Sequence, residues 1–266
     1  MPWRKKLPRT AGKNVPAAAQ IDLEEVSAMK ARIKWTKTGV LKFIGHLDVQ
    51  RYFHKAMMRA ELPVSFSKGM SPHQIMSFAA PLGIGMTSEG EYVDVSFDWC
   101  YSGEEMLARM NAVMNEGIEV LEFKQIDEKE KNCMAVTAAA DYLVTFRKGY
   151  YYTDAFLKRT EPFYFQEQIP ILKKTKRSEK EVDIAPMILD IHAEGEGIFM
   201  KLVTGSSENL KPQLVMEAFC NYLGYDYDPN GFQYHRLETY LKKDGELLPL
   251  GAVGRDVPKA LSPQSN

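Results

Sequence analysis

Cysteine is scarce in this sequence, and its placement excludes several kinds of site. The 266 residues contain three cysteines, Cys100, Cys133 and Cys220, and none lies close enough to another for the paired spacing of a zinc site. A C-x-x-x-C-x-x-C run that could bind an iron–sulfur cluster is absent. An odd number of dispersed cysteines is typical of reduced thiols in the cytosol. We therefore predict no disulfide framework, no metal and no other cofactor.

Long apolar segments are missing as well. The sequence has no apolar run long enough to cross a bilayer and no signal-peptide core. Residues 1–30 are basic and contain several prolines without a periodic apolar face, which favours a disordered arm over a targeting signal. These features predict a cytoplasmic protein with no membrane partner.

A net charge is nearly absent, but the charges are unevenly distributed. The formal net charge is −1, which for the whole chain favours no polyanionic ligand. From Lys30 to His73, however, nine Lys and Arg residues face two acidic ones, an excess of seven positive charges. From Ile84 to Glu130 the balance reverses, with three basic residues and twelve acidic ones. This asymmetry predicts a local positive field in the first part of the chain.

Hydrophobic periodicity divides the chain into two similar halves. Residues 31–45 have the pattern of a strand or a hairpin, and residues 46–62 have a helical period. Ser102 is placed to cap a second helix, and Gly224 to end a later one. Each half gives the order β-α-β-β-α-β, so we predict an α+β protein of two tandem ferredoxin-like domains. The predicted segments are a disordered basic arm (1–30), a first domain (31–131), a second domain (140–245) and a flexible tail (246–266).

Six short motifs in the first half resemble those of a known family. They are K-x-G at Lys37, F-x-x-H-L-D at Phe43, R-A-x-x-P at Arg59, S-x-G-x-x-P-H at Ser67, S-F-A-x-P-L at Ser77 and S-x-x-E-Y-x-D at Ser88. Together they are similar to the signature of the radical SAM-associated proteins, a bacterial family of unknown function. The likeness is strong from Ala31 to Asp127, with departures at Met70, where an aromatic is usual, and at Gln74, where a proline is frequent.

That resemblance implies a partner and a division of labour. Members are encoded beside, or fused to, a radical SAM protein of the B12-binding type, so the catalytic chemistry would belong to that partner. A second similarity, to the RAMP-type ferredoxin-like proteins that bind and process RNA, concerns architecture and a glycine-containing basic surface. Because this similarity concerns the fold, it suggests an RNA-related function only by analogy.

His46 and Asp48 lie at the start of the first predicted helix. One interpretation is structural, in which Asp48 meets free backbone N–H groups and His46 bonds to a neighbour. The other is an anion site, in which the helix N-terminus, His46, Lys37 and Lys42 hold a phosphate together. Both alternatives stay open at this stage.

The loop "SKGMSPH" is the second candidate for a ligand site. Glycine and proline predict a fixed, tight turn, and glycine lets backbone N–H groups approach a ligand closely. The loop supplies donors from the side chains of Ser67, Lys68, Ser71 and His73 and from the backbone of Gly69. The alternative is a rigid turn between strands that binds nothing.

The two histidines also suggest a catalytic alternative. If His46 and His73 met across the sheet, they could serve as general acid and base in RNA cleavage. Metal binding by His46, Asp48, His73 and Asp94 fits the ligand types, but no spacing favours it.

Two basic clusters complete the candidates. Arg51, Lys55 and Arg59 step by four along the first helix, which predicts a shared edge that could follow a phosphate backbone. A second basic patch, in either a solvated hairpin or a positively charged finger, consists of Lys173, Lys174, Lys176 and Arg177.

The sequence thus favours an accessory, non-catalytic protein. It would bind RNA, either tRNA or rRNA, or the radical SAM partner itself, through the surface from Lys30 to His73. The alternatives are an RNA-processing or RNA-modifying enzyme that uses His46 and His73, and a pure protein–protein scaffold.

Overall fold

We describe the protein from a computed structural model that defines residues 29–150, 153–174 and 179–257. The strands are β1 (Met29–Lys37), β2 (Met76–Phe78), β3 (Thr87–Phe97), β4 (Val120–Ile126), β5 (Thr137–Phe146), β6 (Pro170–Lys174), β7 (Glu179–Asp183), β8 (Ile188–Glu194), β9 (Gly197–Val203), β10 (Phe232–Lys243) and β11 (Glu246–Pro249). The α-helices are α1 (His46–Arg59), α2 (Gly103–Asn111), α3 (Cys133–Val136), α4 (Asp154–Leu157), α5 (Thr160–Tyr164) and α6 (Pro212–Tyr222). Three 3₁₀ helices are η1 (Gly39–Phe43), η2 (Ala185–Met187) and η3 (Leu250–Val253).

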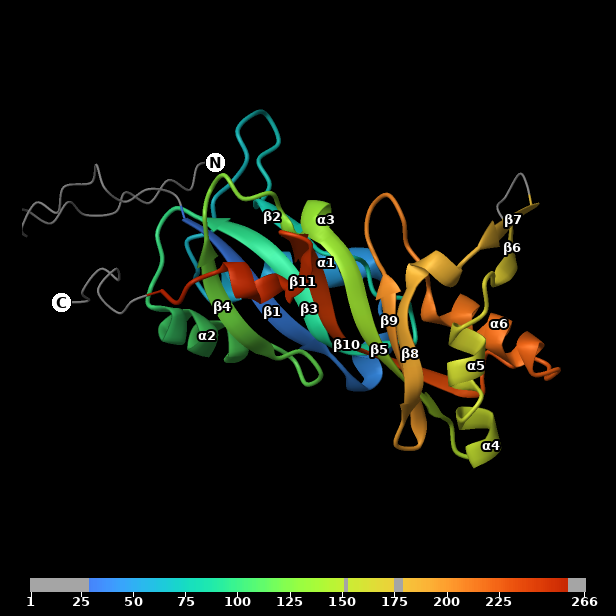
Figure 1. Cartoon of the computed structure of the whole chain (residues 1–266). Coiled ribbons are helices and arrows are strands. Elements are labelled where there is room, and N and C mark those ends of the chain that lie inside the picture. The colour runs from blue at the N-terminus through green and yellow to red at the C-terminus, as the bar shows by residue number, and fades with distance from the viewer. Residues whose placement is uncertain (1–28, 151–152, 175–178, 258–266) are drawn as a thin grey trace, which may run out of the picture.

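One mixed sheet runs through both halves of the described chain (Figure 1). Its main path is β4-β1-β3-β10-β5-β9-β8, while β2 pairs with β3 and β11 pairs with β10. Strands β6 and β7 form a separate two-stranded sheet. The α+β class predicted from the sequence is confirmed.

The two halves have corresponding strand orders. In the first half the neighbours run β4-β1-β3-β2, and in the second β10-β5-β9-β8, so each half reads fourth, first, third, second in chain order. The first connection of the second half differs, because α4 and α5 replace one long helix and the β6–β7 hairpin is inserted after them. That each half is an independent ferredoxin-like domain, over 31–131 and 140–245, stays a prediction.

The halves lie side by side and are joined by a parallel pairing of β3 with β10. His235 pairs with Thr87 and Arg236 with Ser88 at this junction. Each half keeps its own apolar core on the helix-covered face: Phe53, Val93 and Phe97 belong to one, Met200 and Phe219 to the other. The sheet is therefore continuous, whereas the two cores are separate.

Alternation along β1 explains which face is covered. Ala31, Ile33 and Trp35 are buried and pack against α1, which lies behind the sheet in Figure 1. Arg32 is on the opposite face. We call this the open face because α1, α2 and α6 lie on the other side of the sheet, although α3 and η3 cover Arg32 itself. The hairpin considered for residues 31–45 does not form, because the chain leaves β1 into the 3₁₀ helix η1.

Two local predictions agree with the structure. The side chain of Ser102 accepts a hydrogen bond from the backbone N–H of Glu105 and caps α2. Gly224 follows α6 with a φ of 74°, the left-handed conformation that glycine adopts most easily at a helix end.

The predicted flexible tail is wrong for residues 246–257. This segment forms β11 and η3 in front of the sheet (Figure 1), with Leu250 fully buried and Val257 nearly so. Arg255 and Gln125 exchange backbone hydrogen bonds of 2.8 and 2.9 Å, which anchors the segment to β4. Apolar burial and strand pairing thus order a segment that was predicted to be a flexible tail.

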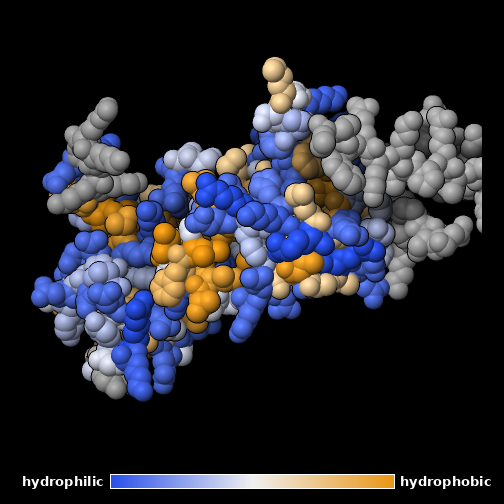
Figure 2. Space-filling view, turned by 180° about the vertical axis from the view of Figure 1, so that it is seen from behind, coloured by the Kyte–Doolittle hydropathy of each residue, from blue (hydrophilic) through white to orange (hydrophobic). Residues whose placement is uncertain are grey.

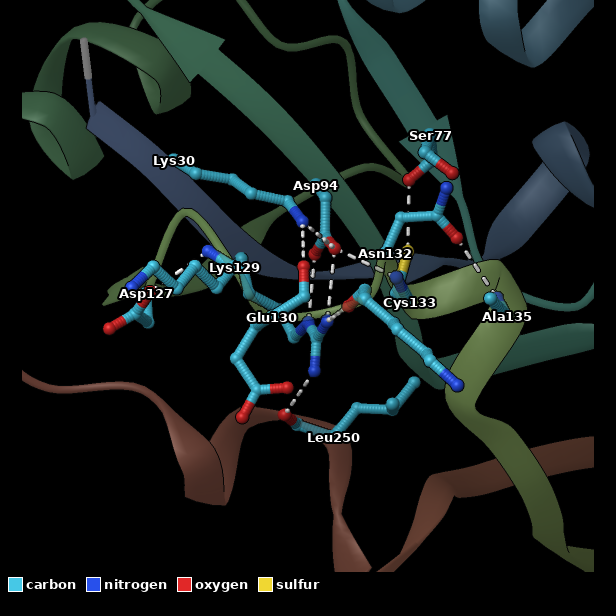
Figure 3. Close-up of polar contacts among 12 residues, drawn as sticks. Lys30, Ser77, Asp94, Asp127, Lys129, Glu130, Asn132, Cys133, Ala135 and Leu250 are labelled. Carbon is cyan, nitrogen blue, oxygen red and sulfur yellow. Dashed lines mark hydrogen bonds and ion pairs between the residues drawn. The ribbon is translucent and has the colours of Figure 1, made fainter.

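A buried ionic cluster on the open face fastens this segment (Figure 3). Arg32 donates from Nε and Nη2 to the two carboxylate oxygens of Asp94, at 2.8 and 2.9 Å, and from Nη1 to the carbonyl of Leu250 at 3.1 Å. The backbone N–H of Cys133 donates to the same carboxylate at 2.7 Å. We call this set the Arg32–Asp94 cluster. It ties β1, β3, α3 and η3 together.

Among the described residues, no helix combines the length and the apolar character needed to cross a membrane.

Candidate functional site

The outer face of α1 carries three exposed cations. Val49, Phe53 and Met57 turn toward the sheet and are buried, so Arg51, Lys55 and Arg59 point to solvent. The predicted shared edge is therefore present.

Two of these cations are held loosely at the surface. Arg51 forms an exposed ion pair with Asp48 at 3.2 Å, and Arg59 donates to the carbonyl of Val113 at 3.2 Å. Asp48 does not cap the helix, because the N-cap is Gly45 and no side chain bonds there. Such exposed contacts are weak, so both guanidinium groups can exchange them for a ligand at low cost.

The "SKGMSPH" loop forms a narrow finger that rises above β2 in Figure 1. Phe66 bridges to Gln74 at its base, and Ser67 N–H donates to the carbonyl of His73 at 2.8 Å. Gly69 has a φ of 122°, which favours glycine over residues with a side chain. The tip projects Lys68 and Gly69 into solvent, so its donors are open to a ligand.

A small pocket lies on the covered face of the first half, close to the β3–β10 pairing that joins the halves. Lys37 from β1, His46 from α1 and Glu91 from β3 line it, together with apolar side chains. Arg236 from β10 donates to Glu91 at 2.9 Å and to the hydroxyl of Tyr142 at 3.2 Å. We call this pocket the junction pocket. Arg236 does not line it but contacts its lining residues Glu91 and Ala80.

The surroundings of the junction pocket lower the pKa values of two of its titratable groups, Lys37 and His46. Burial lowers the pKa of Lys37, an effect that Arg236 increases and Glu91 opposes. Burial likewise lowers the pKa of His46, with Glu91 opposing and Lys37 reinforcing the change. Gln50 Nε2 donates to His46 Nε2 at 3.0 Å, which suits a neutral imidazole with its proton on Nδ1.

Lys37 is not the exposed phosphate ligand that the sequence suggested. The residue is 1% exposed, and its ammonium donates to the carbonyl of Ile44 at 2.8 Å. Lys42, by contrast, is partly exposed, with Nζ 5.2 Å from the ring centre of Phe43. The predicted anion site at the helix start is therefore divided between an interior lysine and a surface lysine.

The structure does not bring His46 and His73 together. His73 Nδ1 lies 2.9 Å from Ser67 Oγ in the exposed finger, whereas His46 bonds to Gln50 at the junction pocket. The base of the finger meets α1 at His54, eight residues and about 12 Å along the helix from His46. A general acid and base must both reach the reacting group, so this separation does not favour the catalytic alternative.

Other predicted groups lie apart. Lys173 and Lys174 end β6, where their side chains are not described, and Lys176 and Arg177 fall outside the described residues. Asp94 is committed to Arg32 on the open face. Within the described parts of the chain, no cluster of three or more His, Cys, Asp or Glu side chains could hold a metal ion.

Sequence reasoning missed Glu91, Arg236 and Tyr142. Their contacts span 94 to 145 residues along the chain, so no local motif joins them. The alternation of buried and exposed positions along β3 and β10 could have located Glu91 and Arg236. Glu91 shares the phase of Val93 on β3, and Arg236 the phase of Tyr234 on β10, so both charges fall at core-facing positions.

These features define an α+β protein with one continuous main sheet, an exposed basic helix and a small charged pocket in its first half. The chain belongs to the bacterial family described as "Uncharacterized protein conserved in bacteria (DUF2344)", which matches residues 30–212. The comparison with curated proteins gives no match. A solved chain from the "Crystal Structure of a Cbf5-Nop10-Gar1 Complex" is 11% identical with a TM-score of 0.39, covering 79% of this chain and 48% of that one. The likeness thus spans about half of that chain's length.

Proposed function

We propose that this protein is an accessory RNA-binding component that works beside a radical SAM protein of the B12-binding type. The proposal of RNA binding rests on the exposed row of Arg51, Lys55 and Arg59 on α1. Phosphate groups bind such rows by electrostatic attraction and counterion release, without any need for a preformed cleft.

The spacing of this row and the charges around it suit a phosphate backbone. Arg51 and Arg59 are eight residues apart, about 12 Å along the helix axis. Further cations come from Lys42 before α1 and from Lys68 in the finger, whose base meets α1 at His54, while Asp48 is paired with Arg51. Exposed cations therefore outnumber carboxylates along this face, which favours a polyanion.

The proposed partner rests on the motifs that resemble the radical SAM-associated family. Those motifs run from Lys37 to Asp94 and include residues of α1, the finger and the junction pocket. In the described residues the three cysteines are buried, and burial raises the pKa of Cys100 and of Cys220 to about 11. Such thiols are poor nucleophiles and poor metal ligands, which supports placing the chemistry in the partner.

RNA binding is tested by reversing the charges of the row. The triple variant Arg51→Glu, Lys55→Glu and Arg59→Glu should lose most of its affinity for tRNA or rRNA at low salt. If three phosphate contacts disappear, the slope of log affinity against log salt falls by about 2 for a single strand. The measurement is fluorescence anisotropy over a salt series.

A matched control separates local contacts from net charge. Lys148, Lys158 and Lys211 are exposed cations of the second half, and their change to glutamate alters the total charge equally. The control triple should retain at least half of the wild-type affinity. Equal loss in both triples, or no RNA binding by the wild type, contradicts the RNA proposal.

The partnership is tested separately by co-purification. The tagged full chain and the radical SAM protein are co-expressed, and the complex is sought by size exclusion. Capture of the partner with no RNA affinity would leave a protein scaffold. RNA cleavage by the purified chain that His46→Ala abolishes would establish the enzyme alternative instead.

A further inference from the structure

An apolar patch surrounds the start of α1. Val40 and Phe43 of η1, Leu47 of α1 and Ile84 are 78%, 62%, 64% and 69% exposed. The backbone N–H of Gly85 donates to the carbonyl of Lys42 at 2.8 Å, which places Ile84 beside η1. Figure 2 shows orange, apolar side chains gathered on the rear face of the molecule, bordered by hydrophilic ones. Contiguous exposed apolar side chains mark interaction sites.

The junction pocket opens next to this patch. His46, which lines the pocket, precedes Leu47, and the pocket-lining Leu82 is two residues before Ile84. The patch and the pocket thus share η1, the first turn of α1 and the segment after β2. A ligand on one is within reach of the other.

The pocket offers hydrogen-bond donors that the protein leaves unused. Lys37 has three N–H donors and one hydrogen bond, to Ile44. Trp35 also lines the pocket, is 2% exposed, and its Nε1–H is buried without a hydrogen-bond partner. The enclosed volume is about 10 Å³, enough for one water-sized group. Size and donors together suit a single acceptor oxygen.

The charge of the site favours an anionic acceptor. Lys37 and Arg236 bring two positive charges near one another, and Glu91 brings one negative charge. With His46 neutral, one positive charge is left over. A carboxylate oxygen would satisfy the donors and offset that charge at once.

We infer that the patch and the pocket dock an acidic, apolar peptide segment of a protein partner. One carboxylate oxygen of the segment enters the pocket toward Lys37 and Trp35, and the neighbouring apolar side chains cover Val40, Phe43 and Ile84. A free carboxylic acid of small size would fill the pocket and leave the patch exposed. A nucleic-acid strand has no aliphatic groups to cover the patch. The inference rests on the proposed accessory role for the existence of a partner.

The test uses defined probes on the full chain. The peptide acetyl-Leu-Glu-Leu-Leu-amide presents the expected chemistry, its Gln counterpart removes the charge, and hexanoate is the free-acid probe. Binding is followed by the fluorescence of Trp35 in a Trp3→Phe, Trp99→Phe background. We expect the Glu peptide to bind at least tenfold more tightly than the Gln peptide and than hexanoate.

Two variants assign the two parts of the site. Lys37→Met should abolish the preference for Glu over Gln, while Phe43→Ser with Ile84→Ser should weaken both peptides alike. The second variant changes exposed side chains, so it keeps the test valid if Lys37→Met fails to fold. Equal binding of the Glu and Gln peptides, or of the Glu peptide and hexanoate, would overturn the inference, as would no binding at all.

RNA binding by the same proteins distinguishes this inference from the RNA proposal. The Phe43→Ser, Ile84→Ser variant should bind RNA as the wild type does. Loss of RNA affinity in that variant would assign the patch to RNA and overturn the peptide site. Intact peptide binding by a chain that binds no RNA would instead leave the docking site standing alone.

Discussion

Two buried arginines on opposite faces of the same sheet show how differently a charge can be used. Arg32, on the open face, hydrogen-bonds through Nε and both Nη atoms, to Asp94 and to backbone carbonyls. Arg236, on the covered face, bonds through its two Nη atoms, while its Nε is buried without a hydrogen-bond partner. Beside it, Lys37 makes one hydrogen bond.

The two groups differ in how completely their buried charges are hydrogen-bonded. Buried polar groups in stable interiors are nearly always hydrogen-bonded, and each exception calls for an explanation. The Arg32–Asp94 cluster meets that standard and joins distant segments of the chain. The junction pocket falls short of it next to an exposed apolar patch, which is the reason to expect a ligand there.

The largest expected effect comes from breaking the complete cluster. Asp94→Asn keeps the size of the side chain but leaves the guanidinium of Arg32 buried without its counter-charge. Removing one partner of a buried pair costs about 3–5 kcal/mol of unfolding free energy. Urea unfolding measures it, with Asp190→Asn as the control, because that carboxylate is exposed. A loss below about 1 kcal/mol for Asp94→Asn would mean that the cluster is not structural.

A somewhat smaller effect is expected at the junction of the halves. A Cβ at Gly90 would lie 2.5 Å from Glu238 Cα and 2.7 Å from the carbonyl oxygen of Leu237, both on β10. Gly90→Ala must therefore push the strands apart, at a cost of about 2 kcal/mol. Gly103→Ala is the control, since its nearest atom would be 3.6 Å away. Equal unfolding free energies for the two variants would show that the junction is loose.

The sequence predicted local features well because local chemistry determines them. The cap at Ser102 and the end of α6 at Gly224 each depend on residues within one helical turn. The α+β class followed from hydrophobic periodicity, and the exposed edge of α1 from its spacing of four. Each of these signals lies within one element.

The errors came from contacts between distant parts of the chain. Residues 246–257 belong to the predicted flexible tail, yet contacts with β4 and Arg32 order them. Lys37 was expected among the ligands of an anion site at the start of α1, a role that needs an accessible ammonium. Counting by two from Ala31 through Ile33 and Trp35 places it on the covered face instead, so this error was avoidable.

The candidate site was predictable in part for the same reason. The α1 cations belong to one helix, so their shared exposure was predictable. The junction pocket instead needs β1, β3 and α1 at once, and its contact with Arg236 also needs β10. No pattern in a single segment reports that β3 lies parallel to β10, because 148 residues separate Thr87 from its partner His235. Such pairings follow from the whole topology.

Removing the incompletely hydrogen-bonded charge of Lys37 should have little effect on stability. Lys37→Met deletes a buried ammonium with one hydrogen bond and leaves Glu91 paired with Arg236. We expect the unfolding free energy to change by less than about 1 kcal/mol, because the lost contact is offset by a lost desolvation penalty. Arg32→Met, measured by the same urea titration, should lose about 3–5 kcal/mol. A comparable loss for Lys37→Met would make the two faces equivalent and remove the contrast between them.

The smallest effect is a pH dependence confined to the junction pocket. Burial keeps the pKa of His46 below its unfolded value of about 6.5, so the fold favours the neutral imidazole. The stabilisation is complete above the unfolded pKa and is lost as the pH falls through the folded one. Between pH 7.5 and 5.0 the wild type should therefore lose more unfolding free energy than His46→Gln, as measured by urea unfolding. An NMR titration of the His46 ring with a midpoint above 6.5 would show a charged histidine, and the pocket would then prefer an anion even more strongly than Lys37 and Arg236 imply.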